Sequence, residues 1–102
     1  MSLKINEILA KAGLETTKKQ NNIILPSSDE NIYTVYGEDW CGFTSAARKL
    51  LQETGKTYIY VSFQGNRPLR NKFSLQYASG HTTIPLIFKG QKFVGGFEQI
   101  KK

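Results

Sequence analysis

The stretch IYTVYGEDWCGFT, residues 32–44, decides the fold of this chain. Its first five residues are β-branched or aromatic, which is typical of a β-strand. A short polar loop follows, and apolar residues at helical spacing predict a helix over 44–54 that ends at Gly55. Cys41, the only cysteine, therefore lies where a strand leads into a helix.

Downstream of this stretch, strand and helix patterns alternate. They predict a strand over 57–63, a helix over 68–78 that begins at a proline, and a hairpin of two short strands over 86–88 and 92–94. The order from residue 32 is β-α-β-α-β-β. The first half is a βαβ unit with parallel strands, and the second ends in an antiparallel pair. We expect an α/β fold with a small mixed four-stranded sheet and helices on its faces.

Upstream, apolar residues at helical spacing predict an extra amphipathic helix over 3–13. Residues 14–31 are polar apart from a short apolar run at 23–25, which suits either an edge strand or a tether. The chain of 102 residues has room for one domain. We therefore divide it into an N-terminal helix and linker, 1–30, and a single domain, 31–102.

Composition and charge exclude several classes of function. The net charge is +6, but the basic residues are spread along the chain, so we expect a solvated basic surface and no nucleic-acid site. The chain contains no run of about 18 apolar residues, so we expect no membrane span. The N-terminus also lacks a secretory signal pattern. A single cysteine allows neither a disulfide framework nor a self-contained zinc site, which favours a reducing, cytoplasmic location.

Cys41 is the candidate reactive group. The free amides and the dipole at a helix N-terminus stabilise a thiolate. Thr44, three residues later, is placed to donate a hydrogen bond to the sulfur. A lone cysteine is otherwise a small buried hydrophobic residue. The position between strand and helix, flanked by Trp40 and Phe43, favours a reactive thiol.

Two further motifs predict a ligand site. In HTTIP, residues 81–85, Pro85 suits the first residue of a strand, and an X-Pro bond can be cis. A cis bond there would turn the backbone of Ile84 toward an extended ligand. In VGGFE, residues 94–98, the glycines allow close approach of a ligand, and a helix beginning at Phe97 would offer free amides to a carboxylate.

Together these motifs resemble the glutaredoxin family. CGFT at 41–44 resembles the Cys-Gly-Phe-Ser of monothiol members, TIP at 83–85 resembles the Thr-Val-Pro with its cis proline, and VGGFE at 94–98 resembles the Gly-Gly-x-Asp segment. The resemblance covers about 31–99. It implies a thioredoxin-like fold, glutathione as the cofactor, and a mixed disulfide between glutathione and Cys41.

The resemblance also implies roles for individual residues. The backbone of Thr83 and Ile84 would pair with the cysteinyl backbone of glutathione. The amides of Phe97 and Glu98 would bind the γ-glutamyl carboxylate, with the Glu98 side chain near the ammonium group. Gln76 would reach the glycyl carboxylate. The full set of implied glutathione contacts is Trp40, Phe43, Gln76, Thr83, Ile84, Pro85, Gly96, Phe97 and Glu98.

The sequence departs from the family pattern in three places. Glu38 and Asp39 stand where the family usually carries a lysine, and two negative charges would disfavour the thiolate and repel glutathione. The short loop with Trp40 resembles the dithiol class. Little sequence follows the VGGFE motif, where the family adds a helix, so we expect the helix over 3–13 to cover the sheet face. The basic residues that could compensate for the acids are Arg70, Lys72 and Lys89.

Three functions remain open, and the first is favoured. In the first reading, the chain would be a glutathione-dependent thiol-disulfide oxidoreductase that acts on glutathionylated proteins through one cysteine. Alternatively, it is a homodimer whose two Cys41 thiolates and two glutathione thiols ligate a [2Fe–2S] cluster. In the third reading it binds a partner without chemistry. We expect a monomer unless a cluster is bound, and neither nucleic acid nor membrane as partner.

Overall fold

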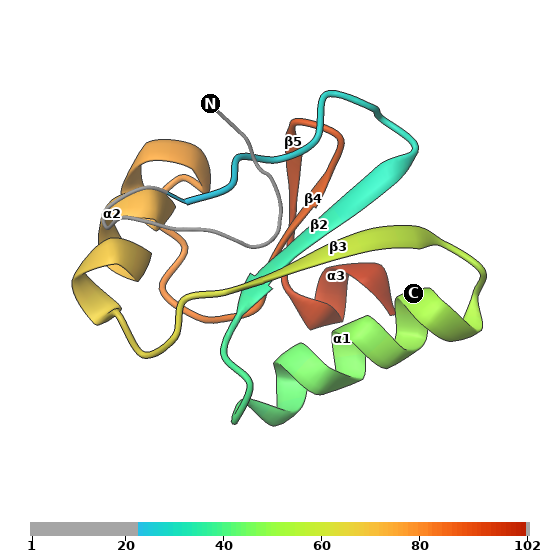
Figure 1. Cartoon of the computed structure of the whole chain (residues 1–102), viewed down its shortest axis with the longest axis horizontal. Helices are drawn as coiled ribbons and strands as arrows, with labels where there is room; N and C mark the ends of the chain where they lie inside the picture. The colour runs from blue at the N-terminus through green and yellow to red at the C-terminus, as the bar shows by residue number, and fades with distance from the viewer. Residues whose placement is uncertain (1–22, 102) are drawn as a thin grey trace.

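The computed structural model describes residues 23–101. It confirms the predicted order β-α-β-α-β-β in β2 (Ile32–Gly37), α1 (Gly42–Glu53), β3 (Thr57–Ser62), α2 (Arg67–Tyr77), β4 (Leu86–Lys89) and β5 (Lys92–Gly95). A short helix that this order did not include, α3 (Phe97–Ile100), follows β5. The four strands form one sheet in the order β3-β2-β4-β5 (Figure 1). The parallel pair β2–β3 and the antiparallel pair β4–β5 are as predicted. The structure adds an antiparallel pairing of β2 with β4. The expected helix over 3–13 lies outside the described residues.

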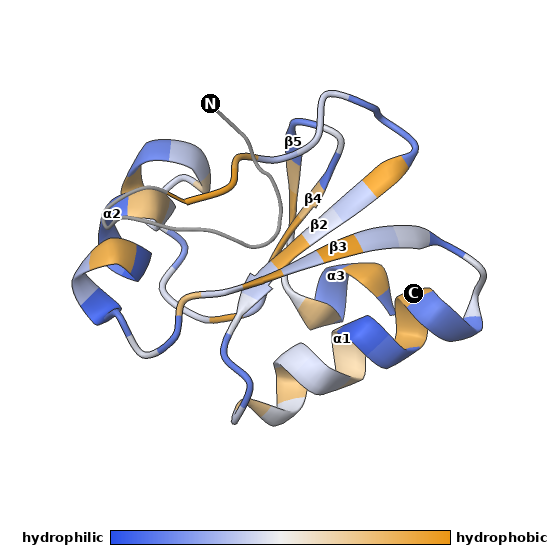
Figure 2. Ribbon diagram, viewed as in Figure 1, coloured by the Kyte–Doolittle hydropathy of each residue, from blue (hydrophilic) through white to orange (hydrophobic). Residues whose placement is uncertain are grey.

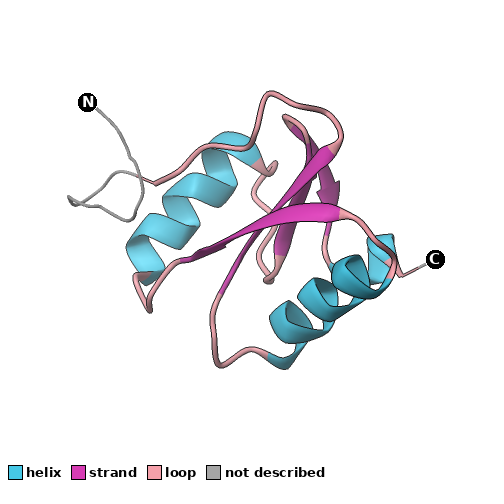
Figure 3. Ribbon diagram, turned by 45° about the vertical axis from the view of Figure 1, so that its right-hand side comes forward, coloured by secondary structure: helices cyan, strands magenta, loops and turns pink. Residues whose placement is uncertain are grey.

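Helices cover both faces of the sheet. α2 lies on one face, and α1 and α3 lie on the other (Figure 3). Side chains alternate between the faces of a strand, so Tyr36 belongs to the core under α2 and Val35 to the core under α1. The first core is largely aromatic and the second aliphatic. Their other main members are Phe63, Phe73 and Phe88 under α2, and Ala47, Leu51 and Ile87 under α1.

Local sequence explains where the two long helices begin. α2 begins after Asn66, whose side-chain oxygen accepts the Leu69 N–H at 3.0 Å, with Pro68 in the first turn. α1 has Cys41 in the N-cap position, and the thiol makes no capping hydrogen bond. Hydrophobic and hydrophilic residues alternate along α1 (Figure 2), since one side of the helix faces the sheet and the other faces solvent.

The apolar run at 23–25 is an anchored irregular segment and forms no strand. Ile23 packs against the aromatic core, and the hydroxyl of Tyr36 donates a hydrogen bond of 2.6 Å to the carbonyl of Ile24. The burial of Tyr36 raises its pKa well above the usual value. The division of the chain at residues 30 and 31 stays a prediction. Within the described residues, no helix has the length and apolar character needed to span a membrane.

Candidate active site

The sheet topology brings three distant segments to one end of the molecule. Tyr36 near the end of β2 lies opposite Leu86 at the start of β4, and Ile87 lies opposite Gly95 at the end of β5. Because β4 is antiparallel to both neighbours, the end of β2, the start of β4 and the end of β5 share one edge. The loop that leads to Cys41 therefore lies at the same end as the two other predicted motifs.

Cys41 occupies the position that the sequence predicts for a reactive thiol. It is the N-cap of α1, with an extended backbone, and its side chain is 9% exposed. Its N–H donates to the carbonyl of Glu38 at 3.1 Å, which closes the tight loop before the helix. Trp40 and Phe43 on either side are largely exposed. Cys41 thus lies at a helix N-terminus, with exposed aromatic residues close to it on both sides in the sequence.

Thr44 does not make the predicted hydrogen bond to the sulfur of Cys41. Its hydroxyl is buried and has no hydrogen-bond partner among the described residues. The side chain packs instead on the end of β2, where a Cβ added to Gly37 would lie 2.3 Å from the Thr44 hydroxyl oxygen. Thr44 thus packs α1 against the end of the sheet, and its proposed contribution to catalysis stays a prediction.

The second motif has the expected backbone. The Ile84–Pro85 bond is cis, and within residues 23–101 the Ile84 N–H has no hydrogen-bond acceptor. A Cβ added to Gly96 would lie 3.4 Å from the Pro85 carbonyl oxygen, so the glycine pair packs directly beside the proline. The backbone of Ile84 is therefore available to an extended ligand at this edge.

Two polar residues that sequence reasoning missed support this loop. The Ser74 hydroxyl on α2 donates to the carbonyl of His81, and His81 Nε2 lies 3.0 Å from the Thr83 hydroxyl oxygen. The His81 ring also packs edge-on against Phe93 of β5. The only signal in the sequence was a single polar residue, Ser74, beside the apolar Phe73 in α2, and it does not reveal its partner.

A short helix begins at Phe97 in the third motif, which is the arrangement that would offer free amides to a carboxylate. The Gly96 N–H donates to the side-chain oxygen of Gln99 at 2.7 Å, and the next two amides, of Phe97 and Glu98, have no acceptor within the helix. The Phe97 ring lies 6.2 Å from the ring of Phe43, which joins this turn to the start of α1. The Glu98 carboxylate pairs with Lys101 at 3.1 Å.

Gln76 lies apart from these groups. It lines a shallow depression between α2 and the segment at 23–25, and no residue of the three motifs lines that depression. Lys72 lines the same depression, and Lys89 lines another beside Glu30. Arg70 is half-buried, one turn before Ser74 on the same side of α2. Of the three basic residues considered, Arg70 is thus the one on the helix face toward the proline loop.

The two acids before Cys41 are both held by other residues. Glu38 is 3% exposed, and its carboxylate accepts the Gly65 N–H at 2.9 and 3.2 Å. Asp39 accepts a hydrogen bond of 2.5 Å from the hydroxyl of Tyr60, and the Arg48 guanidinium lies 3.9 Å from the centre of the Tyr60 ring. Partial burial, followed by the bond to Asp39, raises the pKa of Tyr60 to about 12.

The described residues offer no metal site within one chain. No group of three or more His, Cys, Asp or Glu side chains gathers anywhere in 23–101. The site supplies one thiol, one exposed stretch of backbone and the first amides of a short helix. Its chemistry is therefore that of a thiol beside a surface that suits an extended peptide-like ligand.

Comparisons with known proteins agree with this arrangement. A family model described as Glutaredoxin matches residues 32–94. A glutaredoxin of Pseudomonas aeruginosa is 30% identical over 66 residues, which cover 65% of this chain and 76% of that protein.

Solved structures show the same thioredoxin-like fold. The buckwheat glutaredoxin–glutathione complex is 25% identical, with a TM-score of 0.61 over 72% of this chain and 68% of that one. Glutaredoxin 1 from Francisella tularensis, complexed with cacodylate, is 19% identical, with a TM-score of 0.58 over 69% and 87%. The family match includes Cys41 and the proline loop, and the fold brings both to one edge of the sheet. This chain belongs to the glutaredoxin family.

Proposed function

We propose that this protein catalyses glutathione-dependent thiol–disulfide exchange through Cys41 alone. Membership of the glutaredoxin family supports a thiol–disulfide oxidoreductase role. The observation that carries the finer proposal is the position of the single cysteine, at the N-cap of α1 and at the same sheet edge as the free backbone of Ile84. A cytoplasmic, reducing compartment would supply the glutathione.

The reaction needs only one protein cysteine. The Cys41 thiolate attacks the glutathione sulfur of a glutathionylated protein, so that a Cys41–glutathione disulfide forms and the target protein leaves as a thiolate, which takes a proton from solvent. A second glutathione thiolate then attacks the glutathione sulfur bound to Cys41. Glutathione disulfide forms and the Cys41 thiolate is restored, so the net reaction consumes one free glutathione thiol and releases the thiol of the target protein.

The proposed glutathione site follows the sheet edge. The backbone of Thr83 and Ile84 pairs with the cysteinyl part, and the amides of Phe97 and Glu98 bind the γ-glutamyl carboxylate. The Glu98 side chain must leave Lys101 to reach the ammonium group. The remaining contacts that we propose are Trp40, Phe43, Pro85 and Gly96.

The glycyl carboxylate has two candidate partners on α2. Gln76 stays a prediction, because it lies in the depression beside residues 23–25. We propose Arg70 for this role, since it lies on the same face of α2 as Ser74, whose hydroxyl bonds the proline loop. A guanidinium also suits a carboxylate, which it can bind through two hydrogen bonds.

The intact mass of the protein after incubation with glutathione disulfide tests this proposal. We expect a gain of about 305 Da, reversed by excess glutathione, because exchange at a single thiol adds one glutathionyl group. Cys41→Ser is the matched control and should gain nothing. Reduction of a glutathionylated peptide by glutathione should accelerate with the native protein only. A native protein that takes up no glutathione and accelerates nothing would contradict the proposal.

The alternative is a [2Fe–2S] cluster shared by two chains. Each chain supplies one thiol, so four thiolate ligands require two Cys41 residues and two glutathione molecules. The observation in favour is the exposure of Trp40 and Phe43, 73% and 59%, which a second chain would cover. The short loop before Cys41 counts against it. Visible absorption after anaerobic reconstitution, together with a dimeric mass that Cys41→Ser abolishes, would establish this alternative.

A further inference from the structure

The two acids beside Cys41 require an explanation, because they occupy a site that would receive an anionic reactant. Glutathione carries two carboxylates and one ammonium group at neutral pH, a net charge of about −1. Glu38 is buried and is satisfied by the Gly65 N–H. Asp39 is exposed, so its charge is the one that an approaching anion meets.

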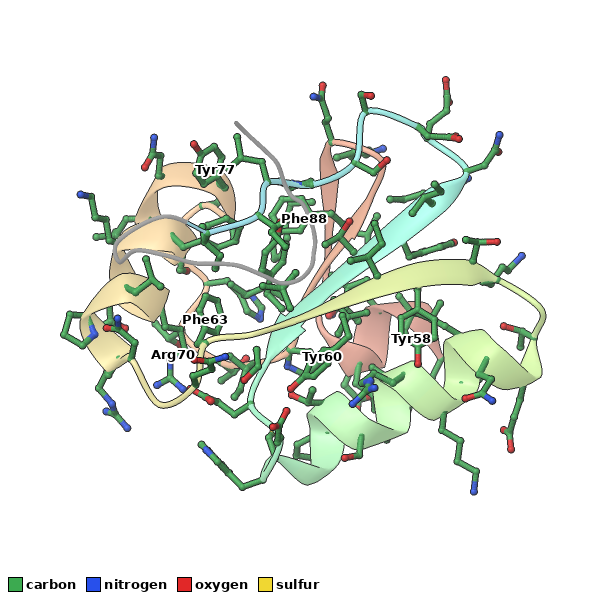
Figure 4. All side chains as sticks on the ribbon, in the orientation of Figure 1. Tyr58, Tyr60, Phe63, Arg70, Tyr77 and Phe88 are labelled. Atoms are coloured by element: carbon green, nitrogen blue, oxygen red, sulfur yellow. The ribbon has the colours of Figure 1, made fainter. Side chains whose placement is uncertain are left out.

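Asp39 is held by a cluster that joins three parts of the chain. Its carboxylate accepts the Tyr60 hydroxyl at 2.5 Å, and Tyr60 lies on β3. Arg48 on α1 places its guanidinium 3.9 Å from the centre of the Tyr60 ring. Figure 4 shows Tyr60, together with Tyr58, on the side of β3 that faces α1. This bond to Tyr60 is the only one that Asp39 Oδ1 makes among the described residues.

We propose that Tyr60 is a positioning residue that holds the Asp39 carboxylate against β3 and so reduces its repulsion of anionic reactants at Cys41. Arg48 contributes a positive charge beside the same pair. The role in catalysis rests on the proposed reaction with glutathione, whereas the effect on anions at Cys41 is measurable without it. Tyr60 touches neither substrate nor thiol in this role and acts through Asp39.

Loss of the Tyr60 hydroxyl isolates the effect. Tyr60→Phe keeps the ring that packs under Arg48 and removes the donor to Asp39. The freed carboxylate then turns toward solvent beside Cys41. In water, a like charge that moves from about 10 Å to about 5 Å from the thiol slows the approach of a monovalent anion by about a further twofold. The repulsion is screened when the ionic strength is high.

The experiment compares two alkylating reagents on the full chain. Iodoacetate is anionic and iodoacetamide is neutral, and both react with the same thiolate, so the ratio of their rates removes differences in thiol ionisation and accessibility. At low ionic strength and fixed pH, we expect Tyr60→Phe to lower the iodoacetate-to-iodoacetamide ratio at least about twofold. Tyr58→Phe, on the same strand and face, should leave the ratio unchanged. The decrease should largely vanish at 1 M salt, where screening acts within about 3 Å.

Rescue separates positioning from a structural effect. Tyr60→Phe with Asp39→Asn should restore the ratio to the wild-type value or above. Asp39→Asn should raise the ratio more in the Tyr60→Phe background than in the wild type, because the charge is held only in the latter. An unchanged ratio in Tyr60→Phe, or a decrease that persists in the double variant, would overturn the proposal.

Folding and function are checked separately. If circular dichroism shows that Tyr60→Phe does not fold, Arg48→Gln tests the same cluster, and an unchanged ratio in that variant overturns the proposal. The glutathione adduct is measured by mass in every variant. If the wild-type protein gains no glutathione adduct, the proposed function is wrong. The alkylation ratios still test the proposed role of Tyr60, because they do not depend on glutathione.

Discussion

Gly37 is the residue that lets β2 and α1 meet at the active site. A Cβ at this position would lie 2.3 Å from the hydroxyl oxygen and 2.7 Å from the methyl carbon of Thr44, which is fully buried. Gly37→Ala should therefore destabilise the protein by about 1–3 kcal/mol through overpacking, measured by chemical denaturation.

Gly42→Ala provides the matched control for Gly37→Ala. A Cβ added to Gly42, the first residue of α1, meets no atom within 4 Å. Alanine also favours the helix, so this variant should be neutral or slightly more stable. Equal midpoints for the two variants would contradict the packing argument.

At the residue scale, the sequence revealed groups whose role depends on near neighbours. The position of Cys41 between a strand and a helix follows from local patterns and is confirmed. The cis bond before Pro85 was implied by the family resemblance, and the structure has it, together with a helix that begins at Phe97. The orientation of Glu38 and Asp39 could not be predicted. Their partners lie 27 and 21 residues away, in elements whose contact depends on the assembled sheet.

At the element scale, Glu38 ties the loop after β2 to the turn after β3. Its buried carboxylate is the acceptor for the Gly65 amide. Glu38→Ala should cost about 1–3 kcal/mol, because a hydrogen bond to a charged group is lost and a part-buried donor is left unpaired. Denaturation and faster hydrogen exchange at Gly65 would report this loss. Glu53→Ala, at the exposed end of α1, is the control and should change stability by less than about 0.5 kcal/mol.

The elements themselves were predictable to within a residue or two. The difference with consequences is at α1, which begins at Gly42, two residues before the predicted start at Thr44. The pattern of apolar residues shows which side of a helix is buried. The first two residues of α1 are exposed, so this pattern does not mark where the helix begins. The earlier start makes Cys41 the N-cap. Pairing of β2 with β4 required the complete topology, since 48 residues, 38–85, lie between the end of β2 and the start of β4 and no local pattern matches the two strands.

At the scale of the whole molecule, two tyrosines should make the stability of the protein fall at alkaline pH. The pKa of Tyr60 is raised to about 12 and that of Tyr36 is raised well above the usual 10.0. The folded protein then keeps protons that the unfolded chain releases above pH 10, so stability is constant below about pH 10 and falls as the pH rises toward 12. Thermal unfolding from pH 8 to 11 should show this decline, and Tyr60→Phe should make it shallower. A melting temperature that rises over this interval would contradict the assigned shifts.

The meeting of three distant segments at one sheet edge also sets the order of events during synthesis. A ribosome completes the loop with Cys41 while the proline loop and the glycine pair are still untranslated. Until the final hairpin has joined the sheet, the nascent chain has Cys41 without the neighbouring backbone that we propose to orient a tripeptide. The proposed redox activity would therefore arrive in a single late step, and a truncated product of translation would lack it.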